Sequence, residues 1–371
     1  MGKLIDRIFN MTLCKHMPAL SGNAKVGKWY EVETPGAICA DGSKWHGFLK
    51  VGKENKVVVL LFGGGVSMDE HTAARGYSAV QEDGAYSDTF SQGMYAMANC
   101  TRLFGLGSNN KKNPFRDWSV IVIPYANGDF HAGCGEVEYT ALNGEKRTLY
   151  HHGYTNFHLM MKEALKQIDA ESMDSVLVTG GSAGGFGSAI LADTAFEYFP
   201  KAKNLAVAVD AGLMVSNKWK EAALHRWHSP KEICDRLVSD DITVDSLIAL
   251  YKKRGKSVRI MFDCAVRDAA LTTVQAYLDG YDRKPLKEDG DAFQRILKNS
   301  VDRMQEEIPN VGIYLFEKIT DEKTALMQHT ILFVPMAFQK FSGGVNPVQW
   351  VHDCMFGTVR NCGLELLEKK Y

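Results

Sequence analysis

The stretch of sequence that most restricts the fold runs from Ser175 to Ile190. It reads Ser-Val-Leu-Val-Thr-Gly-Gly-Ser-Ala-Gly-Gly-Phe-Gly-Ser-Ala-Ile, so that strand-forming residues lead into a Gly-x-Ser-x-Gly turn at Ser182 and then into small residues suited to a closely packed helix. A serine held on so sharp a turn needs neighbours without side-chain bulk, and the glycines provide them. We therefore predict a nucleophile elbow that presents Ser182 at the end of a buried strand.

Short apolar runs alternate with longer amphipathic stretches along the chain. Most of these runs are rich in Val, Ile and Leu throughout, as in strands buried on both faces. The expected strands are Val57 to Phe62, Ser119 to Pro124, Ser175 to Thr179, Leu205 to Asp210, Val258 to Asp263 and Val311 to Phe316. The expected helices are Asn156 to Ile168, Gly185 to Phe199 and a group between Trp219 and Lys253. This alternation predicts an α/β fold, a mostly parallel sheet with helices on both faces.

Three further stretches bear on the organisation of the domain. Tyr30 to Val51 contains glycine breaks typical of an antiparallel hairpin, which we place at the sheet edge. The segment from Glu70 to Trp118 is expected to be a long functional loop. The helical stretch 213–255 would lie as a cap over the carboxyl ends of the strands. No linker divides the 371 residues, so we expect a single domain spanning residues 1–371.

Charge and composition exclude several classes of partner. The formal net charge of −1 gives no electrostatic reason to bind nucleic acid or an anionic membrane surface. No apolar run is long enough to cross a bilayer, and charged residues interrupt the first 22 residues, so no signal-peptide core is visible. The eight cysteines are scattered without a Cys-x-x-Cys pair. We expect reduced thiols, a cytoplasmic location, and neither nucleic-acid nor membrane partners.

A glycine run directly follows the first parallel strand. Val57 to Phe62 leads into Gly63, Gly64 and Gly65, the place where esterases carry a glycine-rich oxyanion loop. Main-chain N–H groups of such a loop can point inward, and the N–H of Ala183, next after the serine, would be the second donor. The run lacks the Gly-x-x-x-x-Gly-Lys and Gly-x-Gly-x-x-Gly spacings, which argues against a phosphate-binding loop.

A serine hydrolase of this kind needs a histidine base later in the chain than the serine and the acid. His329 and His352 both follow the last expected strand. His329 lies about a dozen residues beyond Phe316, where a loop could return over the sheet edge, whereas the segment around His352 is typical of a terminal helix. We therefore favour His329 as the base.

Three aspartates are candidates for the acid that orients the histidine. Asp263 ends an expected strand, Asp268 lies five residues further on before an apolar helix, and Asp210 ends the preceding strand. Each of them could equally serve as a helix cap or a loop residue. Spacing alone does not separate them.

Several segments together resemble, in order and spacing, the pectin acetylesterase and Notum family of α/β-hydrolases. The resemblance runs from about residue 28 to about residue 335 and is carried by residues 39–43, the strand leading to 63–65, and segments 106–118, 125–129 and 180–185. It implies the α/β-hydrolase fold and chemistry that requires no cofactor. It also implies Asp268 as the acid, through segment 266–273, His329 as the base, and Gly65 with Ala183 as the oxyanion hole.

Two departures from the family pattern are informative. Members usually carry Trp after the glycines, where this chain has Val66, Ser67 and Met68. Ala126 and Asn127 stand where the family has a cysteine and the residue after it. Loss of cysteines that relatives use in disulfides fits a reduced protein. Loss of the Trp changes one wall of the pocket, and with the small residues around the elbow it predicts a tight acyl site that prefers short esters other than those of pectin.

The remaining polar clusters give weaker signals. Asp129 and His131 follow a strand end that faces the same crevice as Ser182, so they are candidate substrate contacts. His71 with its acidic neighbours, and the pair His151 and His152, have no third ligand at useful spacing, and we predict no metal site.

These features together predict a serine carboxylesterase with the triad Ser182, His329 and Asp268. Its substrate would be a short acyl ester, most simply an O-acetyl group on a carbohydrate, and no cofactor would be needed. Two different functions are also compatible with the same residues: a serine peptidase or thioesterase, and a catalytically silent α/β-hydrolase that only binds.

Overall fold

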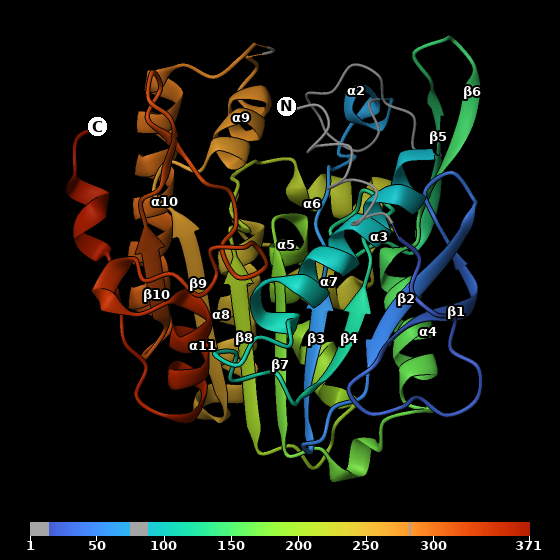
Figure 1. The fold of residues 1–371 in the computed structure, drawn as a ribbon. Coiled ribbons are helices and arrows are strands. Elements are labelled where there is room, and N and C mark those ends of the chain that lie inside the picture. The colour runs from blue at the N-terminus through green and yellow to red at the C-terminus, as the bar shows by residue number, and fades with distance from the viewer. Residues whose placement is uncertain (1–14, 75–87, 282) are drawn as a thin grey trace, which may run out of the picture.

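The computed structural model describes residues 15–74, 88–281 and 283–371, and a twisted central sheet runs through it (Figure 1). Eight strands form this sheet within the described residues. From edge to edge they are β1 (Trp29–Ile38), β2 (Lys44–Lys50), β4 (Ser119–Ile123), β3 (Lys56–Leu61), β7 (Ser175–Gly181), β8 (Asn204–Asp210), β9 (Val258–Ala265) and β10 (Gly312–Phe316). All six strands predicted as buried apolar runs are present.

The pairing in the sheet confirms the predicted α/β class. From β4 to β10 each neighbouring pair is parallel, whereas β1 pairs with β2, and β2 with β4, antiparallel. The predicted hairpin therefore lies at the sheet edge. Every residue of β4 and β7 is buried, which explains their unbroken apolar runs.

Helices cover both faces of the sheet. The longer ones are α3 (Asp88–Leu103), α4 (Gly153–Ala164), α5 (Ala183–Glu197), α8 (Ile242–Arg254), α9 (Ala269–Leu278), α10 (Lys287–Glu307) and α11 (Pro347–Phe356). In the view of Figure 1, α3 and α11 lie in front of the strands, and α5 and α8 behind them. Among the described helices, none is both long and apolar enough to span a bilayer.

The remaining elements are short. Two small antiparallel ribbons consist of β5 (Gly135–Thr140) with β6 (Lys146–His151), and β11 (Ile319–Asp321) with β12 (Leu326–Met327). The short helices are α2 (Glu70–Ala73), η1 (Gly105–Gly107), η2 (Ala170–Ser172), α6 (Trp219–Glu221), η3 (Ala222–Arg226), α7 (Lys231–Arg236), η4 (Gly255–Ser257), η5 (Ser342–Gly344) and η6 (Leu364–Glu368).

The prediction of a long loop from Glu70 to Trp118 is wrong for much of that segment. Its described part contains α2 and the 16-residue helix α3, while residues 75–87 lie outside the described chain. Met94, Ala98 and Thr101 are buried at the three- to four-residue spacing of a helix. The many polar residues of this segment made the helical spacing of its buried residues hard to recognise in the sequence. Helix α3 forms a wall of the site described below.

The stretch 213–255, expected to be a cap, contains elements of two kinds. Its longest helix, α8, connects β8 to the parallel strand β9 and packs on α5, so it covers a face of the sheet as a crossover helix. The shorter helices α6, η3 and α7 precede it, and Trp219 and Trp227 in this part pack around Phe130. A cap formed by these shorter helices stays a prediction.

Candidate active site

Ser182 lies on the turn between β7 and α5. Its backbone has φ 58° and ψ −128°, a conformation that is strained for any residue with a side chain. A Cβ added to Gly184 would lie 2.1 Å from the carbonyl oxygen of Leu61, so only glycine allows α5 to start this close to the neighbouring strand. The sharp turn directs the Ser182 side chain into a cavity that Ser182 helps to line.

The glycine run after β3 passes directly over this turn. A Cβ on Gly63 would lie 2.7 Å from the Cβ of Ser182 and 2.9 Å from the backbone nitrogen of Ala183. Gly64, Gly65 and Ala183 all line the cavity that Ser182 faces. The structure therefore brings together the main-chain groups that the sequence proposes as oxyanion donors.

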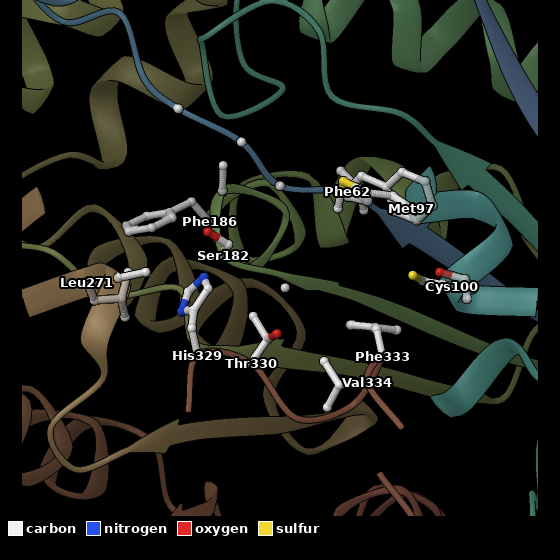
Figure 2. A pocket seen from close by; sticks show the side chains of 18 of the residues that line it. Phe62, Met97, Cys100, Ser182, Phe186, Leu271, His329, Thr330, Phe333 and Val334 are labelled. Atoms are coloured by element: carbon white, nitrogen blue, oxygen red, sulfur yellow. The ribbon is translucent and has the colours of Figure 1, made fainter. Parts of the chain in front are cut away.

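His329 and Asp268 form a close pair beside Ser182. The His329 Nδ1 lies 2.9 Å from each carboxylate oxygen of Asp268. Asp268 is fully buried and also caps α9, because its Oδ1 accepts a hydrogen bond from the Leu271 N–H at 2.9 Å. The His329 side chain is 24% exposed, and its second ring nitrogen is directed toward the side chain of Ser182 (Figure 2).

Nearby carboxylates control the protonation of this histidine. Burial acts to lower the pKa of His329, but the charge and hydrogen bond of Asp268, together with the charge of Asp210, outweigh it. The pKa of His329 is therefore raised above its ordinary value. The imidazolium form is stabilised, as a base that must hold a proton during a reaction requires.

The other two candidate acids occupy a different position. Asp210, the last residue of β8, lies opposite Asp263 of β9, and both are fully buried. Asp210 accepts hydrogen bonds from the backbone N–H groups of Ile331 and Leu332, at 2.9 and 2.8 Å from its Oδ2. Burial raises the pKa of both carboxyls. Asp210 thus holds the chain just beyond His329, which sequence reasoning did not foresee.

Arg267 holds the chain on the other side of His329. Its buried guanidinium donates hydrogen bonds to the carbonyl oxygens of Ala325, at 3.2 Å, and Thr324, at 3.0 Å, and pairs with Asp291. The Met327 N–H donates to the Arg267 carbonyl at 2.9 Å. The sequence does carry one signal for this contact: Arg267 directly precedes Asp268 in a segment expected to be buried, and a buried cation needs partners.

His352, the second histidine considered as the base, lies elsewhere. It is on α11, where its ring packs against Phe115 and Phe356 and its Nδ1 lies 3.8 Å from Asp353. It is absent from the lining of the cavity.

Asp129 and His131 are placed differently from the substrate contacts expected of them. Both are almost completely buried, and neither belongs to the cavity lining. Asp129 accepts hydrogen bonds from the N–H groups of His131, Gly133 and Gly153. The His131 Nε2 lies 2.8 Å from the carbonyl oxygen of Phe62. Because burial lowers the pKa of His131 to about 4, it is neutral and donates there, supporting the glycine run from below.

The cavity itself is large and mainly apolar. Its volume is about 510 Å³, within the range of small-molecule sites. Phe62, Met97, Phe333 and Val334 surround the side of the cavity that lies away from Leu271 (Figure 2). Sequence reasoning missed the wall supplied by α3, although residues 96–97, 100–101 and 104 recur with helical spacing.

The neighbouring histidines do not assemble a metal centre in the described residues, where no group of three His, Cys, Asp or Glu side chains could hold a metal ion. His151 is fully buried, and its Nδ1 lies 2.9 Å from the Asn127 carbonyl oxygen. That contact gives it a structural partner.

Comparison with known proteins now identifies the family. The family model described as pectinacetylesterase matches residues 24–238, more than half of the chain. The chain belongs to the pectinacetylesterase family. It is accordingly a carboxylic ester hydrolase of the acetylesterase kind with the α/β-hydrolase architecture. No curated protein matches the chain. The matched span contains Ser182 and the glycine run but ends before Asp268 and His329, so the family match does not reach that pair.

Proposed function

We propose that this family member is a serine carboxylesterase that removes a short acyl group, in the first place an O-acetyl group, from a carbohydrate. Ser182 would be the nucleophile, His329 the base and Asp268 the orienting acid. The observation that carries the proposal is the contact of His329 with the buried Asp268 on one edge of its ring while the other edge faces Ser182. This is the order of contacts that acyl transfer needs.

The reaction proceeds in two halves. The Ser182 Oγ attacks the ester carbonyl carbon while the His329 Nε2 accepts its proton, and the oxyanion that forms receives hydrogen bonds from main-chain N–H groups of Ala183 and of Gly64 or Gly65. Cleavage of the carbon–oxygen bond releases the alcohol, which takes the proton from His329. Water then attacks the acyl-enzyme with His329 as base again, which releases the acid and restores Ser182.

The cavity favours a second candidate, an ester with a longer acyl chain. A volume of about 510 Å³ is more than an acetyl group fills, and the lining from α3 and segment 333–335 is mainly apolar. The tight acyl site predicted from small residues around the elbow did not take this wall into account. Burial of each methylene of a longer chain would contribute about 0.8 kcal/mol to binding.

A fluorophosphonate probe combined with a panel of esters tests both candidates. We expect the probe to label Ser182, which mass spectrometry of the labelled peptide would establish. A series of p-nitrophenyl esters from acetyl to palmitoyl, followed by acetylated glycans, then reports the preferred acyl group. Highest kcat/KM for acetyl to butyryl esters supports the first candidate, and a preference for octanoyl or longer chains the second. Failure to label would favour a silent binding protein, and turnover of amides or thioesters alone would favour a serine peptidase or a thioesterase.

The cytoplasmic location expected from the sequence belongs to the same proposal. Six of the described cysteines carry no disulfide: Cys39, Cys134, Cys234, Cys264, Cys354 and Cys362. We expect titration of the denatured, unreduced protein to count eight thiols in all. A count of four or fewer would contradict a reducing compartment.

A further inference from the structure

A second, smaller pocket begins next to the active-site cavity. Its volume is about 270 Å³, slightly below the ~300 to 1,000 Å³ of sites for drug-sized ligands, so it offers room for one ring-sized group. It is lined by Met68, Asp69, His71, Lys218, Tyr277, Leu278 and Gly280.

The two pockets share a wall on helix α9. Leu271 and Val274 line the active-site cavity, and Tyr277 and Leu278 line the second pocket. Residues three and four apart lie on the same face of a helix, and the rise of ~1.5 Å per residue places Tyr277 about one turn beyond Val274. The second pocket therefore lies about one turn further along α9 than the cavity.

The opposite wall is shared as well. Val66, directly after the glycine run, lines the active-site cavity, and Met68 and Asp69 line the second pocket. A group bound in the second pocket would lie beside the glycine run that receives the oxyanion. The apolar wall from α3, by contrast, belongs to the cavity alone. The α3 wall would thus lie on the side of the acyl group, and the second pocket on the side of the alcohol.

The second pocket has the chemistry that a sugar ring requires. The Tyr277 ring stacks on the His71 ring, with centroids 5.1 Å apart and an interplanar angle of 21°, and the two rings together form an aromatic part of the pocket lining. The Asp69 carboxylate and the Lys218 ammonium lie 3.8 Å apart and supply an acceptor and a donor for hydroxyl groups. Their charges cancel, which favours a neutral ring over a uronate or a phosphate.

We propose that this pocket binds the sugar ring of the alcohol part of the substrate, a neutral pyranose whose acetyl group lies against Ser182. The inference rests on the proposed function and deepens it. Tyr277 stacks on the C–H face of the ring, and Asp69 and Lys218 bind its hydroxyl groups. The pocket thus discriminates among alcohols, while the α3 wall discriminates among acyl groups.

Two esters with the same acyl group and different alcohols test the proposal. An O-acetylated methyl glucopyranoside reaches the second pocket, whereas the ethyl group of ethyl acetate is too short. We expect Tyr277→Leu to lower kcat/KM for the sugar ester about tenfold or more and to leave ethyl acetate unchanged, because even one missing methylene in a hydrophobic pocket is worth ~10-fold to 200-fold. Tyr30→Leu on the edge strand β1 is the matched control and should change neither.

A second variant, Lys218→Met, keeps the proposal testable if Tyr277→Leu fails to fold. The Lys218 side chain is 56% exposed, so Lys218→Met removes a donor without disturbing the core, and we expect a several-fold loss for the sugar ester alone. Equal changes for both esters, or no change for either in both variants, would overturn the proposal.

Binding without turnover separates this proposal from the proposed function. Saturation-transfer NMR should detect the acetylated methyl glucopyranoside on Ser182→Ala and lose it on Ser182→Ala with Tyr277→Leu. If the unmodified protein hydrolyses neither ester, the proposed function fails, and this binding pair decides the pocket independently. Equal signals from the two variants would exclude the pocket as a sugar site.

Discussion

The two halves of the candidate active site are built in different ways. The elbow half, which carries Ser182, is held by backbone packing: Gly184 approaches the Leu61 carbonyl so closely that no Cβ fits. The histidine half is a segment with little regular structure, and side chains from elsewhere in the fold help to hold it by binding its backbone. Arg267 binds the chain before His329, and Asp210 binds it after.

Because of this difference, we expect substitutions in one half to affect mainly the stability of the protein and substitutions in the other half to affect mainly catalysis. The elbow lies at the centre of the sheet, where β7 pairs with both β3 and β8, so disturbing it disturbs the core. The histidine segment lies outside the eight-stranded sheet, and two of its anchors are the single polar side chains of Arg267 and Asp210. Substitutions in the elbow glycines should therefore cost stability first, and substitutions of the anchors should cost turnover first.

The largest effect is expected from Ser182→Ala. Removal of the hydroxyl should lower kcat roughly 10⁶-fold, by comparison with other serine hydrolases, and leave the melting temperature nearly unchanged. Rates with p-nitrophenyl acetate and a thermal melt measure the two quantities. Ser188→Ala, on the same helix and outside the cavity, is the control and should keep its activity. Near-normal turnover in Ser182→Ala would end the triad hypothesis.

Asp268→Asn should lower kcat roughly 10⁴-fold, because the amide favours the wrong imidazole tautomer. The asparagine still caps α9, so we expect little loss of stability. The charge of Asp268 raises the pKa of His329, so its removal lowers that pKa. Residual activity, which needs neutral His329, should persist to lower pH than in the unmodified protein. An acid limb of the pH profile that stays in place would contradict the pairing.

Asp210→Asn tests the anchor beyond His329. Loss of the charge weakens the hydrogen bonds from Ile331 and Leu332, and the resulting displacement of His329 should lower kcat on the order of 10²-fold with little effect on KM. Asp210 also helps to raise the pKa of His329, so the acid limb should move to lower pH. A loss of activity that follows the unfolded fraction, with an unmoved pH profile, would show a structural role alone.

The same contrast explains what the sequence could predict. The elbow and the glycine run are contiguous motifs whose strand and helix context is visible locally, and both lie where we expected them. The histidine side depends on residues far apart in the chain, such as Asp210 and Ile331, which parallel strand ends bring together. Asp129 and His131 show the same limit. Their position after a strand predicted that they face the crevice, but it did not show that both are buried and absent from the cavity lining. Whether a side chain after a strand faces the cavity or the protein interior depends on how the sheet and helices pack.

Gly184→Ala tests the elbow half. The added Cβ meets the Leu61 carbonyl oxygen at 2.1 Å, and overpacking of this kind costs ~1 to 3 kcal/mol of unfolding free energy. Urea denaturation measures it. Gly144→Ala, in the turn between β5 and β6, is the comparison. No heavy atom lies within 4 Å of its added Cβ, so only its positive φ carries a cost, ~1 kcal/mol. Equal losses at both positions would mean that close packing does not hold the elbow.

Asp263→Asn distinguishes the roles of the two buried carboxyls. Asp263 lies within β9 and, unlike Asp210, has no hydrogen bond to the described histidine segment. Burial and the charge of Asp210 raise the pKa of Asp263 well above its usual value. Its folded pKa therefore exceeds its unfolded pKa of ~3.9, so the stability that the neutral carboxyl contributes is fully present below the unfolded pKa and is lost as pH rises through the folded pKa.

The asparagine is neutral at every pH, so the free energy of unfolding of the variant does not fall with rising pH for this reason. Between the two pKa values, the unmodified protein should lose ~1.4 kcal/mol of unfolding free energy per pH unit relative to Asp263→Asn. Urea denaturation at two pH values one unit apart measures this difference, and kcat at neutral pH should stay unchanged. A constant difference in stability would mean that Asp263 ionises normally. A fall in kcat would place Asp263 among the anchors of His329, and the division between the two halves of the site would have to be redrawn.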